Sequence, residues 1–285
     1  MQNQISTAYS KHRTARNALF HSAILSADFP GPTVDHILTN VIAHSPSLTE
    51  LVESQALDTR NNLVFSLRPP EYVKRLITEV QRRLINAQTT GGAAVRGKQL
   101  WTMPRESLHI TVLEVVHSTT PAAVESLIQT IGMQHLERMV DYPAGKGVRL
   151  GKPFLSFDKA ALAVSFLPIE GGGDRDYTYH HLRGDLWGML RKRGIDVSSR
   201  YIVPSAHLTV GRFIETGPAG TGSVAKEMER WIKAIDEIND WLEKNGEQYM
   251  RGDDGEGQSF WEIDTPLDLR KGLLWYGGGQ TVVKV

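Results

Sequence analysis

A six-residue segment occurs twice in this chain, and the repetition limits the folds that the chain can adopt. The segments are Ser107–Val112 and Ser205–Val210, which match at Ser, His, Thr and Val and are apolar at the other two positions. Their β-branched and aliphatic residues are typical of strands in a buried sheet. Because alternate residues of a strand face the same way, the His and Thr of each segment share one face and the aliphatic residue between them packs on the other.

Elements of the same type recur in the same order around the two segments. The first series is a strand, an amphipathic helix, the first His-containing strand and a helix. The second series is two strands, a helix, the second His-containing strand and a long helix. The expected ranges are 62–67, 73–84, 108–116 and a helix from 120, then 148–157, 160–167, 177–193, 201–203, 207–213 and 223–244, and a terminal hairpin of 272–276 with 281–285. This internal duplication predicts two similar α+β lobes whose histidines meet across a shared cleft.

The first 60 residues differ in pattern from the rest of the chain. Short helical patterns at 33–44 and 47–56, together with the Pro30-Gly31-Pro32 break, predict an N-terminal helical cap or extension over 1–60. A two-lobed domain is then expected over 61–285, with lobe one at about 61–145 and lobe two at about 146–285.

Composition argues against several classes of protein. The chain has no cysteine, which rules out disulfides, thiolate metal sites and cysteine nucleophiles. Its 32 basic residues balance 32 acidic ones, so broad binding to nucleic-acid duplexes is not expected. A polar start and the absence of a long apolar run predict a soluble, unsecreted protein of the cytoplasm or nucleus with no membrane partner. The sequence leaves the oligomeric state open.

A pair of His-x-Thr motifs suits the cleavage of a phosphodiester. This reaction needs a base to activate water or a neighbouring hydroxyl, an acid for the leaving oxygen, and donors for the phosphoryl oxygens. The imidazoles of His109 and His207 can carry out both proton transfers near neutral pH. The hydroxyls of Thr111 and Thr209 can donate to the nonbridging oxygens. The motifs therefore predict a reaction that needs neither metal nor cofactor.

Other histidines and glycine runs fit structural roles better than catalytic ones. His12-Arg13-Thr14 and His117-Ser118-Thr119 have the same spacing, but neither combines an expected strand with an aliphatic middle residue. His180-His181 lack the further ligands of a metal site and are expected to be solvated or to cap a helix. The glycine triplets at 171–173 and 277–279 lack the P-loop pattern and are expected to be turns.

With its two His-x-Thr motifs, the sequence resembles the two-histidine (2H) phosphoesterase superfamily. It is more closely similar to the fungal members described as RNA ligase-like or cyclic nucleotide phosphodiesterase-like. The resemblance runs from about Asn61 to Val285 and includes the phrases 62–65, 100–104 and 201–204. It implies a bilobal α+β fold with two pseudo-symmetric antiparallel sheets, flanked by helices around a central cleft, and no cofactor. It also implies substrates such as RNA 2′,3′-cyclic phosphates, ADP-ribose cyclic phosphates or 2′,5′-linked oligonucleotides, without choosing among them.

The resemblance also assigns site residues. His109 and Thr111 match the first family motif, and His207 and Thr209 match the second. For water attack on a 2′,3′-cyclic phosphate, His207 is expected to be the base and His109 the acid, and the opposite order stays open for a transesterifying relative. Arg212 is a further candidate for phosphate contact, although strict alternation points it away from His207. Further candidates to frame a base or ribose are Arg105, Tyr201, Phe65 and Trp101.

Two other functions stay open. A binding module could hold a nucleotide or an RNA end in the same cleft without turnover, although the intact set of two histidines and two threonines argues against it. A metal-dependent phosphodiesterase is disfavoured because the sequence shows no clustered ligand motif.

Overall fold

The computed structural model describes residues 2–44, 58–89, 100–169, 177–199, 202–215, 223–251 and 259–283. The α-helices in these ranges are α1 (Gln2–Ile24), α2 (His36–His44), α4 (Glu71–Thr89), α5 (Pro121–Ile131), α6 (Met133–Val140), α7 (Tyr179–Arg191) and α8 (Ser223–Tyr249). The strands are β1 (Asn61–Leu67), β2 (Leu100–Thr102), β3 (Ile110–Thr119), β4 (Val148–Phe157), β5 (Ala161–Ile169), β6 (His207–Phe213), β7 (Trp261–Ile263), β8 (Asp268–Gly272) and β9 (Gln280–Thr281). A 3-10 turn, η1 (Arg105–Ser107), precedes β3.

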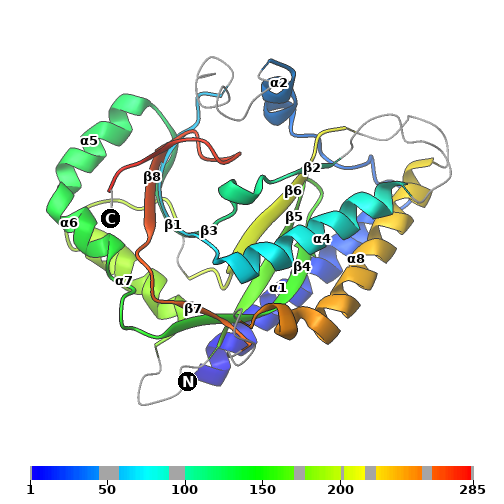
Figure 1. The fold of residues 1–285 in the computed structure, drawn as a ribbon. Coiled ribbons are helices and arrows are strands. Elements are labelled where there is room, and N and C mark those ends of the chain that lie inside the picture. Colours follow the sequence, from blue (N-terminus) through cyan, green and yellow to red (C-terminus); the bar gives the residue numbers. More distant parts are fainter. Residues whose placement is uncertain are drawn as a thin grey trace.

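The described strands form one antiparallel sheet in the order β7-β4-β5-β6-β3-β1-β8-β9, with β2 beside β6. Strand β1 lies between β3 and β8, just as β5 lies between β6 and β4, so the two halves of the sheet have the same arrangement. Figure 1 shows α5, α6 and α7 on one side of the molecule and α1, α4 and α8 on the other, with the strands between them. The α+β class is therefore as predicted.

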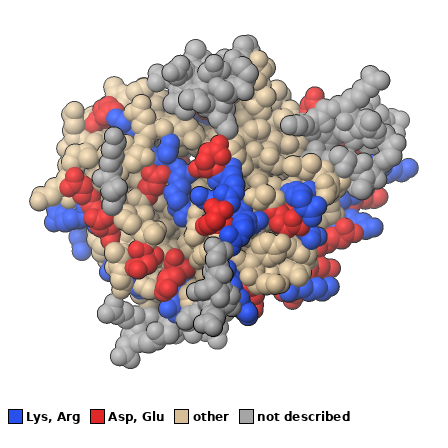
Figure 2. All heavy atoms as spheres, in the orientation of Figure 1, with Lys and Arg blue, Asp and Glu red and all other residues tan. Residues whose placement is uncertain are grey.

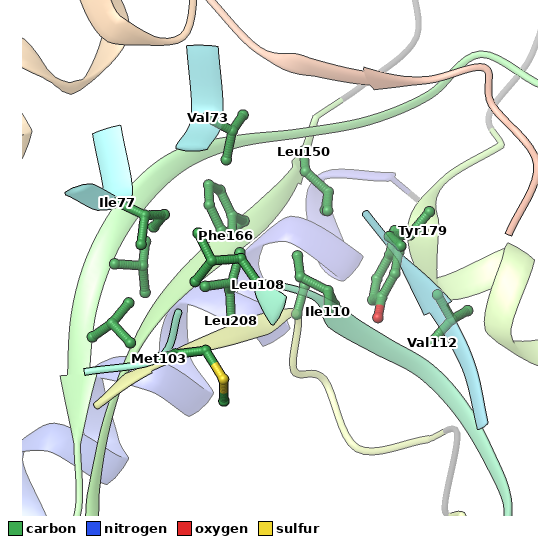
Figure 3. Close-up of a cluster of buried hydrophobic side chains, with 14 of the residues drawn as sticks. Val73, Ile77, Met103, Leu108, Ile110, Val112, Leu150, Phe166, Tyr179 and Leu208 are labelled. Atoms are coloured by element: carbon green, nitrogen blue, oxygen red, sulfur yellow. The ribbon is translucent and has the colours of Figure 1, made fainter. Parts of the chain in front are cut away.

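The two His-containing strands join the halves of the sheet. The pairing between β3 and β6 consists of Ile110 opposite Leu208. Both side chains are fully buried and belong to the hydrophobic cluster in Figure 3. The sequence predicts two sheets, and this is wrong in one respect: main-chain pairing at this point merges them into a single sheet.

Each His-containing strand carries a β-bulge shortly after its Thr. In β6 the register passes from Thr209 to Gly211 against consecutive residues of β5, and in β3 it passes from Thr111 to Leu113 against consecutive residues of β1. The extra residue in each strand reverses the alternation of side chains beyond it. As a result, Arg212 lies on the face of its strand that carries His207, contrary to the expectation from strict alternation.

The helices that the sequence predicts from apolar spacing form largely as expected. The stripe of α4 is completely buried, and it consists of Val73, Leu76, Ile77, Val80 and Leu84. Thr120 caps α5, where its hydroxyl accepts a hydrogen bond of 3.2 Å from the backbone N–H of Ala123, and Pro121 begins the helix. One hydrophobic cluster runs from Tyr9 to Val283, so the halves share a core.

The N-terminal region is a more integral part of the fold than the sequence indicates. Helix α1 packs on β4 and β5, and Tyr9 and Ile24 lie in the core. The sequence places these residues in a helical cap without marking this helix, because the inward face also carries Arg13 and Asn17, which obscure the apolar period. The helix expected at 33–44 forms as α2, whereas the pattern at 47–56 lies outside the described residues. None of the described helices has the length and apolar character that a membrane span requires.

The C-terminal hairpin differs from the prediction in both register and location. It pairs β8 with β9, so residues 273–279 are the connection and not a strand. Gly277 and Gly279 adopt φ angles of 97° and 84°, as expected of a turn. Strand β8 also pairs with β1, so the expected boundary at about residue 145 does not divide the sheet: late residues complete the first half. Residues 202–203, expected to be extended, lie in a turn, where Arg183 binds the Val203 carbonyl oxygen at 2.6 Å.

Candidate active site

A cavity of about 250 Å³ lies where the two halves of the sheet meet. His109, Thr111, His207 and Thr209 all line it. Because Ile110 pairs with Leu208 in antiparallel strands, Thr209 lies across from His109 and His207 lies across from Thr111. The structure thus brings the two motifs together and places each histidine beside the threonine of the other motif.

Local hydrogen bonds orient both imidazoles. Nδ1 of His109 lies 2.8 Å from the carbonyl oxygen of Ser107. A carbonyl only accepts, so Nδ1 carries the proton and Nε2 is the nitrogen available for chemistry. Nδ1 of His207 lies 2.9 Å from the hydroxyl of Ser205, which can donate or accept. The first serine of each repeated segment therefore holds the histidine that follows it.

The surroundings of the two imidazoles favour their neutral forms. His207 lines the cavity and is exposed to solvent there, and the protein atoms around it desolvate its imidazole. This desolvation lowers the pKa of His207 to about 4, and the charges of Arg16 and Arg183 add to the decrease. Desolvation also lowers the pKa of His109, although its hydrogen bond to Ser107 opposes the change. A bound anion would act in the opposite direction and favour protonation.

Two arginines from the first half of the sheet supply positive charge beside His109. Arg68 and Arg270 line the cavity and share one carboxylate, Asp268, at 2.7 Å and 3.6 Å. Arg68 also donates to the Leu108 carbonyl oxygen at 3.2 Å, which ties it to the strand that carries His109. Nε of Arg270 is buried and has no hydrogen-bond partner among the described residues. Together with Asp268, this pair leaves a net positive charge at the cavity wall and one guanidinium N–H without a partner among the described residues.

A third arginine comes from the second half. The bulge in β6 brings Arg212 to the cavity, where it lies 3.6 Å from Asp35 and stacks over the ring of Trp275 at 5.6 Å. Arg60 lies over the same indole at 4.8 Å, and the indole N–H is buried without a hydrogen-bond partner among the described residues. Figure 2 shows Lys and Arg atoms gathered near the centre of the visible face, with Asp and Glu atoms beside them.

Three of the remaining residues expected from the sequence, Arg105, Phe65 and Trp101, do not line this cavity. Arg105 pairs with Glu71 in an exposed position. Phe65 is fully buried, because the cavity-facing positions of β1 are Val64 and Ser66, so its ring cannot stack on a base. Trp101 packs edge-on against Tyr276 with ring centroids 6.1 Å apart and is not among the residues that line the cavity. Tyr201 lies outside the described residues.

Several cavity residues are missed by sequence reasoning, namely Arg68, Glu114, Arg270 and Trp275. Arg68 continues the polar face of β1 after Ser66, so alternation offered a signal for it. Glu114 depends on the bulge in β3, and Arg270 and Trp275 depend on the pairing of β8 with β1. These three had no local signal.

Gly277 lines the cavity and lies against Ser107, the residue that orients His109. Its φ is 97°, and a Cβ at this position would overlap the side chain of Ser107, whose carbonyl oxygen holds His109. We expect Gly277→Ala to lower the free energy of unfolding by roughly 1–3 kcal/mol and to misalign His109. Gly188→Ala in α7 is the control, because its Cβ would meet nothing within 4 Å. Thermal melts of both variants check this, and a melt of Gly277→Ala like that of the wild type would contradict it.

Other candidate ligand groups have structural roles where the structure describes them. His181 caps α7: its Nδ1 accepts a hydrogen bond of 3.1 Å from the backbone N–H of Thr178, the capping role expected for the 180–181 pair. No cluster of three or more His, Asp or Glu side chains suited to a metal ion occurs among the described residues.

Comparisons with known proteins are sparse. No protein-family model and no curated protein matches the chain. A solved structure of a conserved protein of unknown function from Agrobacterium tumefaciens has a TM-score of 0.46 at 12% identity, over 79% of this chain and 85% of that one. Usb1 of Kluyveromyces marxianus, solved with uridine monophosphate, has a TM-score of 0.39 at 13% identity, over 77% of this chain and 94% of that one. At TM-scores under 0.5, neither likeness bears on function.

Proposed function

We propose that this protein is a metal-independent phosphodiesterase that hydrolyses a cyclic phosphate or an RNA-type phosphodiester, with a 2′,3′-cyclic phosphate as the first candidate. One observation carries the proposal: the Ile110–Leu208 pair brings a His-x-Thr motif from each half of the sheet to one arginine-lined cavity. The resemblance of both motifs to the 2H phosphoesterases points to the same chemistry.

The phosphate would lie between the two imidazoles. The hydroxyls of Thr111 and Thr209 can donate to its nonbridging oxygens, and the unused donor of Arg270 can add a charge-assisted hydrogen bond. These groups are held by the sheet before substrate arrives, so they can stabilise the charge that develops on the phosphoryl oxygens without reorganising.

The two histidines then divide the proton transfers. His207 begins neutral, with its Nδ1–H donated to Ser205, and Nε2 takes a proton from water as the water oxygen attacks phosphorus. His109 begins protonated, a form that the Ser107 carbonyl favours, and gives the Nε2 proton to the leaving oxygen as the P–O bond breaks. The product is a phosphomonoester, and proton exchange with solvent restores both imidazoles.

The direct test is turnover in the presence of a chelator. We expect the purified protein to hydrolyse at least one member of a panel of 2′,3′-cyclic nucleotides, ADP-ribose cyclic phosphates, 2′,5′-oligonucleotides and RNA 3′ ends in excess EDTA. Product release is followed by chromatography. Activity that returns only when a divalent metal is added would contradict the proposal and support the metal-dependent alternative.

A binding protein that uses the same cavity without turnover gives a different result. In that case both the wild type and His207→Ala would bind a nucleotide or RNA end, and neither would turn it over. Binding by calorimetry, measured beside the turnover assay, separates the two functions.

The pH dependence follows from the shifted imidazoles. The base must be neutral and the acid protonated, so kcat/KM should be bell-shaped, with apparent pKa values that belong to the pair. Burial lowers the pKa of both histidines in the free protein, so both limbs should lie on the acid side of the unperturbed value near 6.5. The negative substrate raises both pKa values, so the kcat profile should move to higher pH. A kcat/KM optimum above pH 8 would contradict this assignment.

A further inference from the structure

A second cavity, of about 270 Å³, adjoins the first, and helix α1 forms one of its walls. The two cavities share His207, Thr209, Arg212 and Trp275. Another wall is formed by β5, which contributes the small side chains of Ala161, Ala163 and Ser165 together with Phe166. In the sheet register Ala163 lies opposite Thr209, and Ser165 lies opposite His207. Small residues thus leave open space directly beside the proposed base.

Helix α1 presents basic side chains to this space. Arg13 donates to the carbonyl oxygens of Lys152 and Ser165, at 2.7 Å and 3.4 Å, and lies 4.9 Å over the ring of Phe154. It has no ion pair among the described residues, and burial lowers its pKa to about 10. Partial burial of a cation without a carboxylate carries a desolvation cost, which a ligand that supplies the missing negative charge would offset.

Two neighbours of Arg13 on α1, Arg16 and His12, also have groups that could contact a ligand. Arg16 forms a 2.9 Å ion pair with Asp158 but keeps nearly half of its side chain exposed, and its charge is felt by His207. Nε2 of His12 is buried and lacks a hydrogen-bond partner among the described residues. His12 and Arg13 therefore line this cavity, although the His12-Arg13-Thr14 spacing is unrelated to the two motifs.

The charge balance of the second cavity is positive. Arg13, Arg16 and Arg212 line it together with one carboxylate, Asp158. Asp35, which is not in the lining, pairs with Arg212 at 3.6 Å, and Nε of Arg212 remains buried without a partner in the described part of the chain. An excess of guanidinium charge with unused donors suits a phosphate group, whose oxygens match the planar fork of arginine.

We propose that the second cavity binds a second phosphate of the substrate. The preferred substrate is then a nucleotide whose scissile phosphodiester lies between the histidines, while an additional phosphate lies against α1. This inference rests on the proposed function for the first cavity and narrows its substrate class. The shared lining at His207 and Arg212 lets one ligand occupy both cavities at once.

Calorimetry with product-like ligands tests this without requiring turnover. The probes are adenosine 2′-monophosphate, adenosine 2′,5′-bisphosphate and adenosine 2′-phosphate 5′-diphosphate. They share one base and differ in the second anionic group. We expect at least one ligand with a second anionic group to bind the wild type about tenfold tighter or more than the monophosphate. Equal affinities for all three would overturn the inference.

Variants of the second cavity locate the effect. Arg13→Gln and Arg16→Gln should each remove most of the preference for the second phosphate and leave the monophosphate affinity within about twofold. Asp158→Asn, which keeps the oxygen that accepts from the backbone N–H groups of Ala160 and Ala161, should increase the preference. The control is Arg82→Gln, because Arg82 is an exposed arginine of α4 that pairs with Glu79.

Melting transitions show whether each variant folds. The test still works if Arg13→Gln does not fold. Arg16→Gln and Asp158→Asn then suffice, because they change the cavity charge in opposite directions. Variants that weaken all three ligands equally would refute a second phosphate subsite. Turnover without a preference for the second phosphate refutes this inference alone, whereas the preference without turnover refutes the proposed activity alone.

Discussion

Replacing either histidine with alanine is expected to lower kcat by about 10² to 10⁴, the usual contribution of a positioned proton-transfer group. His109→Ala removes the acid and His207→Ala removes the base, and each leaves the threonine and arginine donors in place. Steady-state kinetics on the best substrate of the panel, with melting transitions to show that the fold persists, measure the effect.

The double variant should be little worse than either single one. The two histidines carry out the proton transfers of one reaction. Once one histidine is absent, the other can no longer act in a concerted pair, so its removal costs little more. The control is His117→Ala, which alters an exposed histidine that also precedes a threonine by two positions but lies outside both cavities. A well-folded His207→Ala variant with unchanged turnover would refute the division of roles, as would strictly multiplicative losses in the double variant.

Replacing either motif threonine with valine should lower kcat by roughly 10 to 10³. The change removes one hydroxyl donor to the phosphoryl oxygens and preserves the β-branched shape that suits the strand. Thr209 lies across from His109 and Thr111 lies across from His207, so each loss also loosens the phosphate against the imidazole of the other motif. The effect should therefore fall on kcat more than on stability.

The matched control for both threonines is Thr130→Val, on the exposed side of α5, where the hydroxyl donates to the Ser126 carbonyl oxygen at 2.8 Å. Kinetic constants of the three variants on one cyclic phosphate substrate give the comparison. If Thr111→Val and Thr209→Val behaved like Thr130→Val, the phosphate would not lie between the two strands.

Local pattern was enough to predict the strands that carry the histidines. β6 spans His207–Phe213 as expected, and β3 begins within two residues of the predicted start, because alternation and β-branched residues are properties of the segment itself. The common cavity also followed from the duplication, since equivalent strands of related halves meet at the centre of the sheet.

The remaining features depend on contacts that no short segment encodes. The face on which Arg212 lies depends on a bulge, and one extra residue in β6 reverses the outcome of strict alternation. Arg270 reaches the cavity because β8 pairs with β1, and its partner in the register is Val64, which lies 206 residues earlier (270 − 64). The sequence pattern does not reveal helix α1, because its inward side faces a cavity as well as the core. Arginines occupy positions where apolar residues would have shown the helical period.

In the proposed mechanism both halves of the sheet act on one phosphate. The most direct measurement is a crystal structure of the protein with a bound nucleoside 2′-monophosphate. We expect its phosphate oxygens to lie within hydrogen-bond reach, about 2.6–3.2 Å, of Nε2 of both His109 and His207. A phosphate that contacts only one histidine, or that binds outside the cavity shared by the two motifs, would contradict the account.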